Sequence, residues 1–219
     1  QKMINMMYLV LTALLALNVS KEVLNSFFEV NTGVVRTTTN FTSKNMETYN
    51  DFTAAAELNP VKAGPFRDQA LAVKREADAI VNFIQELKYG LVLAVDKSVF
   101  LGQYKDLDGE IIEGNETELT WDKLSKEQKK LPIANLNNKE NRDMSGETLV
   151  ITGKASSLKQ QINSFKNNML TIAGDNEVLA FNIKSALDTE DKNGKGGSAK
   201  IPWENYNFLD MPSVGALTL

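Results

Sequence analysis

The chain of 219 residues contains no cysteine and no histidine. Without cysteine it has no disulfide framework and no thiolate ligand for a metal ion. Without histidine it lacks the side chain that most often serves as a general base or a metal ligand. These absences argue against a hydrolase or a metalloenzyme. No P-loop, GxGxxG or GxSxG motif is present, so we expect no enzyme activity and no cofactor.

Clustered positive charge is also missing. The chain has 24 Lys and Arg against 28 Asp and Glu, for a net charge of −4, and both signs are mixed throughout. A nucleic-acid-binding surface normally shows a basic patch, so we expect no nucleic-acid partner. The acidic loop that begins at Thr189 fails as a calcium loop, because its first position is threonine and its twelfth is Lys200. We therefore predict no metal site.

Proline and glycine are almost absent from the first quarter of the chain. Between Met3 and about Leu58 there is no proline, and Gly33 is the one glycine. This pattern predicts one very long helix. Asn59-Pro60 and Gly64-Pro65 then indicate a turn, and we expect the next helix to open at Pro65.

An apolar segment from Met3 to Val19 begins that long helix and runs directly into Ser20, Lys21 and Glu22. About 17 residues at about 1.5 Å each span about 25 Å, enough for one membrane crossing. We predict a single transmembrane helix over residues 1–27, with a cytoplasmic N-terminus next to Lys2. A cleaved signal peptide fits less well, because the apolar run is long and an A-x-A-like cleavage site is missing.

Polar side chains gather on one face of this predicted helix, at about 100° per residue. They are Asn5, Tyr8, Thr12, Asn18 and Glu22. Such groups are costly at membrane depth and usually face a partner or an ion path, so we predict a proton-pathway or partner-contact site. A second interpretation remains open, in which Tyr8 is an interfacial aromatic residue and Glu22 marks the end of the span.

The rest of the chain predicts an all-α fold, an antiparallel helical bundle over residues 28–219. Apolar residues alternate three and four apart over 70–94 and 158–172, as in bundle seams. Asp175 is the expected N-cap of a shorter helix, and 203–209 is a further helical segment. We interpret 102–148 as an irregular insertion with a small hairpin near Glu110–Ile112, and 188–199 as a flexible loop.

The first 30 residues carry a specific resemblance. The strings QKMINMMYLV and LLALNVSKEV closely resemble the N-terminus of the GldM/PorM family of gliding-motility and type IX secretion proteins of Bacteroidetes. Beyond residue 30 the resemblance rests on architecture, since the family has one membrane helix, a helical first periplasmic domain and then β-rich domains. It implies that this chain covers the membrane helix and the first periplasmic domain.

The resemblance also implies partners. It suggests a homodimer whose membrane helices lie inside a pentameric ring of GldL (PorL) subunits in the inner membrane. Proton flow through this pair would drive motion that a periplasmic stalk carries to outer-membrane-side secretion components, through C-terminal domains outside this chain. The tyrosine and glutamate that matter in the family's membrane helix fall on Tyr8 and Glu22.

A protein of another class, a membrane-anchored sensor with a helical ligand-binding bundle, is the alternative. Such a receptor usually needs a second membrane helix and a cytoplasmic output domain, and the sequence given contains neither. The polar face, the long continuous helix and the lack of catalytic residues favour a structural subunit that transduces energy.

Overall fold

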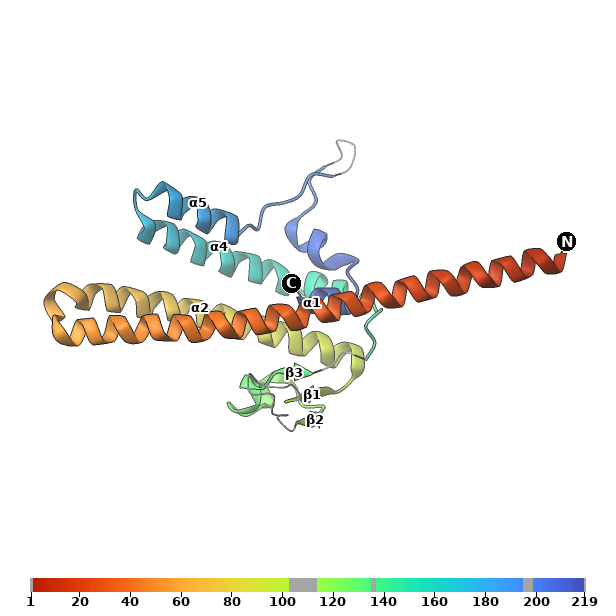
Figure 1. Cartoon of the computed structure of the whole chain (residues 1–219), viewed down its shortest axis with the longest axis horizontal. Helices are drawn as coiled ribbons and strands as arrows, with labels where there is room; N and C mark the ends of the chain where they lie inside the picture. The colour runs from red at the N-terminus through yellow and green to blue at the C-terminus, as the bar shows by residue number, and fades with distance from the viewer. Residues whose placement is uncertain (1, 103–113, 135–136, 195–198, 219) are drawn as a thin grey trace.

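The computed structural model describes residues 2–102, 114–134, 137–194 and 199–218. Within residues 2–35 the helix path is described throughout, whereas the described side chains are those of Met6, Met7, Leu11, Ser26, Glu29, Val30 and Val34. Most of the described chain is helical, and long antiparallel helices dominate its shape (Figure 1). The expected predominance of α-helix is therefore confirmed.

The longest element is α1, a single helix of 57 residues from Lys2 to Leu58. At 1.5 Å per residue it is about 85 Å long. The hydroxyls of Thr37, Thr42, Thr48 and Thr53 donate to the carbonyls four residues earlier at 2.9–3.1 Å, so these polar side chains are satisfied within the helix. The prediction of one long helix ending near Leu58 is confirmed.

Helix α2, from Pro60 to Asp96, runs back antiparallel to α1. The side chain of Asn59 caps it by accepting a hydrogen bond from the Lys62 N–H at 3.1 Å. Our expectation that this helix opens at Pro65 is wrong, because Asn59 and Pro60 already supply the cap and the first-turn proline. Pro65 lies inside the helix instead.

Two further helices form a second layer beside this hairpin. Helix α4 (Lys154–Ala173) packs against α2, and α5 (Glu177–Ala186) folds back onto α4. Gly174 ends α4 with φ 54°, as its place after the seam predicts. The cap of α5 is Asn176 rather than the expected Asp175, since the Asn176 side chain accepts from the Leu179 N–H at 3.0 Å.

The insertion between α2 and α4 contains a small antiparallel sheet that the sequence analysis missed. Its central strand β1 (Val99–Leu101) pairs with β2 (Asn115–Thr117) and with β3 (Ile133–Ala134). Strands of two or three residues are too short to show an alternating pattern. The hairpin expected near Glu110–Ile112 lies outside the described residues.

Short helical turns complete the chain. The single turns η1 (Trp121–Lys123) and η2 (Gln128–Lys130) lie in the insertion. Helix α3 (Asp143–Ser145) continues into η3 (Gly146–Ile151), and the helical segment expected at 203–209 contains η5 (Asn205–Leu209). The apolar C-terminal stretch forms α6 (Ser213–Thr218), which is largely buried and packs against α1.

The described parts of the loop expected at 188–199 are joined by a backbone pair. The backbones of Lys192 and Ile201 exchange hydrogen bonds of 2.8 and 3.0 Å. The described parts of the segment on either side of this pair therefore lie antiparallel to each other. We call residues 188–203 the 188–203 arm.

The buried core lies at one end of the α1–α2 hairpin, where α2 ends. It joins the last three turns of α2 to β1, α4, η5 and α6. Its most enclosed members are Tyr89, Leu91, Val92, Val99, Leu101 and Ala155. Of the predicted α2 seam, Leu87 and Leu91 are buried, whereas Ile80 and Ile84 are half-buried. We call this region the base of the bundle.

Candidate functional site on α1 and at the base of the bundle

The sequence-predicted site residues Asn5, Tyr8, Thr12, Asn18 and Glu22 all lie on α1. Helical continuity places Tyr8 and Glu22 about 21 Å apart along one axis, as the pattern required. Their side chains lie outside the described residues, so what each contacts stays a prediction.

No helix is both long enough and apolar enough to cross a membrane when the described residues are searched.

The start of α1 projects beyond the bundle. Helix α2 has 37 residues and pairs with the end of α1, which has 57, so 57 − 37 = 20 residues of α1 extend past it. Figure 1 shows this projecting part leading to the N-terminus. With the hairpin turn at Asn59, the end of α2 comes level with about residue 22 of α1. Glu22 therefore lies where α1 leaves the bundle.

Asp96, the last residue of α2, organises the loop that follows the sheet. Its carboxylate accepts hydrogen bonds from the backbone N–H groups of Asn137 and Asn138, at 2.7 and 3.0 Å, and from the Asn138 side-chain amide at 3.0 Å. Hydrogen bonds to an ionised acceptor are stronger than neutral ones. The loop is thereby fixed to the end of α2.

The same loop holds α6. The carbonyl of Asn141 accepts from both the backbone N–H and the hydroxyl of Ser213, at 2.8 and 2.6 Å, and Ser213 is fully buried. Because α6 packs against α1, a chain of contacts runs from the end of α2 through residues 137–141 to α1. Sequence reasoning missed this connection, since no motif or spacing joins Asp96, Asn141 and Ser213.

An exposed apolar stripe runs along α1 above the base. Val30, Val34, Phe41 and Phe52 are 57%, 47%, 60% and 38% exposed. At about 100° per residue they lie within about 40° of one another, and on the side of α1 that carries Tyr8. Ala56, which is buried, lies about 40° beyond Val34 and Phe52 around the helix, so the stripe borders the buried side of α1. We call the four exposed residues the stripe Val30–Val34–Phe41–Phe52, and in the single chain it is partly exposed to solvent.

A cluster of charges fixes the 188–203 arm to α4. The Lys159 ammonium lies 2.6 Å from the Asp191 carboxylate and 3.5 Å from that of Glu204. Asp191 also accepts from the Trp203 backbone N–H at 2.9 Å. The hydrogen bond from Lys159, followed by that from Trp203, lowers the pKa of the Asp191 carboxyl, and the bond to Asp191 raises the pKa of Lys159.

These charges are arranged as ion pairs and not as a metal site. Across the described ranges, no group of three or more acidic, histidine or cysteine side chains is placed to hold a metal ion.

A family model described as the GldM N-terminal domain matches residues 22–111 and 111–219. The chain belongs to the GldM N-terminal domain family. A comparison with curated proteins finds no match. Membership connects the chain with gliding motility and type IX secretion.

The matched region of this GldM-family chain begins at residue 22, where α1 leaves the bundle. The match therefore covers the bundle and the paired part of α1, and excludes the projecting segment. The resemblance seen in the first 30 residues comes mostly from that segment. Two largely separate parts of the chain thus indicate the same family.

Proposed function

We propose that this chain is a dimeric subunit of an inner-membrane motor that is driven by the proton motive force. Together with a ring of GldL subunits it powers type IX secretion and gliding, and it passes mechanical energy to a periplasmic stalk. The projecting part of α1 spans the inner membrane once, its N-terminus is cytoplasmic, and the bundle is periplasmic. The chain carries out no enzymatic reaction of its own.

The observation that carries this proposal is the continuity of α1. One helix of 57 residues contains the apolar segment, the polar face around Tyr8 and Glu22, and the long strut of the bundle. A helix resists bending and twisting because each turn is hydrogen-bonded to the next. A displacement of the projecting segment would reach the base without a flexible joint.

The exposed stripe on α1 supports the dimeric part of the proposal. Large apolar side chains recur along one face of α1 and stay 38–60% exposed, with Thr37, Lys44 and Thr48 between them. Exposed apolar side chains that gather on one face indicate an interaction site. Two copies side by side, with parallel α1 helices, would bury the stripe and continue its line towards the membrane through Phe27.

An insertion in α1 tests the proposal. Seven residues placed between Glu22 and Val23 of the full-length protein separate the polar face from the bundle. A helix-forming Ala-rich insert of seven residues adds about 700° of rotation, which is about 20° short of two full turns. The polar face therefore keeps nearly the same orientation relative to the bundle. A Gly-Ser insert of the same length breaks the continuity. We expect cells with the Ala-rich insert to secrete and glide, and cells with the Gly-Ser insert to do neither.

Both proteins must accumulate to equal levels and bind the GldL ring, as co-purification would measure. If the Gly-Ser protein secretes as well as the Ala-rich one, mechanical transmission through α1 is wrong.

A further inference from the structure

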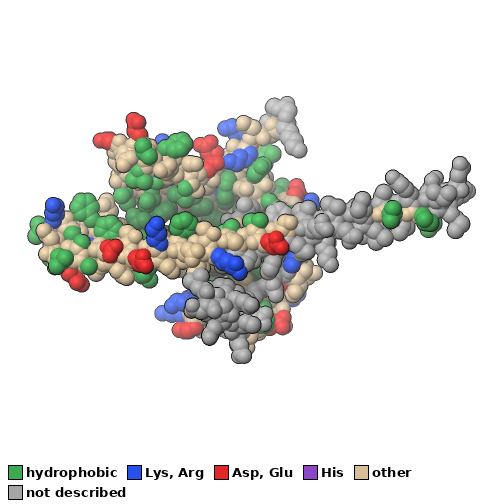
Figure 2. Space-filling model, viewed as in Figure 1, with side chains coloured by type: hydrophobic (Ala, Val, Ile, Leu, Met, Phe, Trp, Pro, Cys, Tyr) green, Lys and Arg blue, Asp and Glu red, His purple; other side chains and the backbone are tan. Residues whose placement is uncertain are grey.

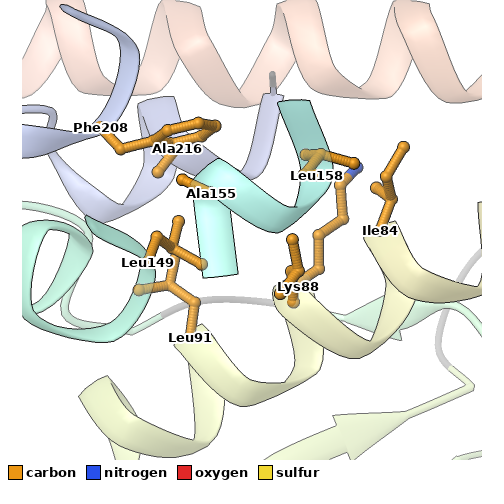
Figure 3. A pocket seen from close by; sticks show the side chains of 9 residues that line it. Ile84, Lys88, Leu91, Leu149, Ala155, Leu158, Phe208 and Ala216 are labelled. Atoms are coloured by element: carbon orange, nitrogen blue, oxygen red, sulfur yellow. The ribbon is translucent and has the colours of Figure 1, made fainter. Parts of the chain in front are cut away.

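A pocket opens into the apolar base of the bundle, between α2, η3, α4, η5 and α6 (Figure 3). Its empty space is about 390 Å³, counting the part that opens to solvent. Eight of its nine lining residues are apolar, among them Leu91, Leu158 and Phe208. Figure 2 shows hydrophobic side chains gathered in the recess between the α4–α5 layer and α1.

Lys88 is the one charged residue that lines this pocket. It rises from α2, and its amine lies beside Leu158 (Figure 3). Three other lysines of the described chain have carboxylate partners, namely Lys74 with Asp78 at 2.5 Å, Lys159 with Asp191 and Lys192 with Asp188. No described residue gives the Lys88 ammonium a hydrogen bond or an ion pair.

The surroundings of Lys88 disfavour its charge. Burial of the side chain lowers the pKa of its amine. A half-buried cation without a counter-charge is costly, and a carboxylate placed next to it would offset that cost. The rest of the lining offers no hydrogen-bonding side chain, so it can accept only hydrocarbon.

We propose that this pocket binds a single-chain carboxylate amphiphile, with the carboxylate on the Lys88 amine and the alkyl chain between Leu91, Leu158 and Phe208. The head would form a charge-assisted hydrogen bond, and the chain would remove apolar lining from water. The limited space favours a chain of medium length. This site is separate from the Tyr8–Glu22 face, and it does not depend on the motor role.

A titration with alkanoates tests the site. The full chain in lipid nanodiscs, labelled with ¹³C at leucine and alanine methyl groups, is titrated with butanoate, octanoate and octan-1-ol. The methyl signals of Leu91, Leu158 and Ala216 report occupation directly. We expect saturable shifts with octanoate and at least tenfold weaker binding of butanoate. We also expect octan-1-ol, which has a similar chain and no charge, to bind at least tenfold more weakly.

Two matched variants isolate the charge. Lys88→Met keeps the hydrocarbon stem and removes the amine, and it should weaken octanoate binding at least tenfold. Lys74→Met, on the same helix and outside the pocket, should leave binding unchanged. Equal binding of octanoate and octan-1-ol to the parent protein would overturn the proposal whether or not Lys88→Met folds. Absence of a saturable shift at millimolar octanoate would do the same.

Discussion

The position of Glu22 in the sequence and on α1 makes it the main candidate residue of the predicted site. It follows the apolar segment directly in sequence, and it lies on α1 level with the end of α2. A carboxylate at such a boundary can meet water, a partner or a proton path. At about 100° per residue, its neighbour Lys21 belongs to another side of the helix, which provides an internal comparison.

Replacing Glu22 by alanine tests whether the polar face acts in energy transduction. We expect Glu22→Ala to leave expression and GldL binding intact and to reduce secretion and gliding strongly, because on the proposed function this charge couples proton movement to helix position. Tyr8→Ala should give a similar, milder defect. Secretion assays on cells that carry the full-length variants measure both effects.

Lys21→Ala is the control, and its effect should be small. An assembled Glu22→Ala protein that secretes at the parent rate would favour the alternative, in which Glu22 only marks the end of the span.

Asp191 gives a prediction for acidic conditions. Its pKa is lowered in the folded chain from the ordinary value of 3.8, mainly by the hydrogen bond from Lys159. Ionised Asp191 therefore stabilises the 188–203 arm above that ordinary value, and the contribution is lost as the pH falls through the lowered pKa. Amide NMR signals of Lys192 and Ile201 should report loosening of the arm at those acidic pH values.

Asp191→Asn should loosen the arm already at pH 7, since the charge is absent at every pH. Asp68→Asn, which removes an exposed carboxylate from the far end of the hairpin, should leave these signals unchanged. Identical arm signals in Asp191→Asn and the parent at pH 7 would show that the Lys159 contact contributes nothing.

At the scale of elements, the helices were predictable because their signals are local. Absence of proline defined α1, a three-four alternation defined α2 and α4, and Gly174 ended α4. The exact caps were less predictable, since Asn59 with Pro60 and Gly64 with Pro65 both resemble a helix start. The small sheet and the Asp96–Asn141–Ser213 connection were not predictable, because they depend on contacts between segments distant in sequence.

Leu91 tests which part of α2 holds the bundle together. The side chain is 1% exposed in the base, so Leu91→Ala should lower the free energy of unfolding by about 2–5 kcal/mol. Val81 lies on another face of α2 and is 54% exposed. Val81→Ala should therefore lower the free energy of unfolding by less than about 0.5 kcal/mol. Urea unfolding followed by circular dichroism compares the two. Equal losses in both variants would contradict a core confined to the base.

For the whole molecule, the main question is how the exposed stripe on α1 is used. The stripe continues the side of α1 that carries Asn5, Tyr8 and Thr12, so a partner lying along it would also approach these residues. Glu22 lies about 80–120° away from the stripe around the helix, so the predicted site and the predicted dimer surface overlap only in part. The side of α1 on which these residues lie follows from their spacing in the sequence. That the stripe is exposed could be known only from the fold.

Single cysteines test the dimer against a natural background without cysteine. Cysteine at Val34 or Phe41, on the stripe, should link two copies in membranes under mild oxidation. Ser43→Cys, also exposed and on the opposite side of α1, is the matched control and should not link. Non-reducing gels measure the outcome. Equal linking at Val34 and Ser43 would indicate random collision, and no linking at either stripe position would contradict a dimer through α1.

The placement of the core at the base has a mechanical consequence. The tightly packed core lies beside α1, which it meets through α6 and the end of α2, close to where α1 leaves the bundle, whereas Leu58 and Val61 at the far tip are 89% and 90% exposed. In terms of stiffness, α1 is braced from one side at the base of the bundle, and the α1–α2 hairpin is more compliant beyond it. A twist applied to the projecting segment would first strain the contacts of α6 and Asp96, because these lie nearest to it. The distant tip of the hairpin would oppose the motion only weakly.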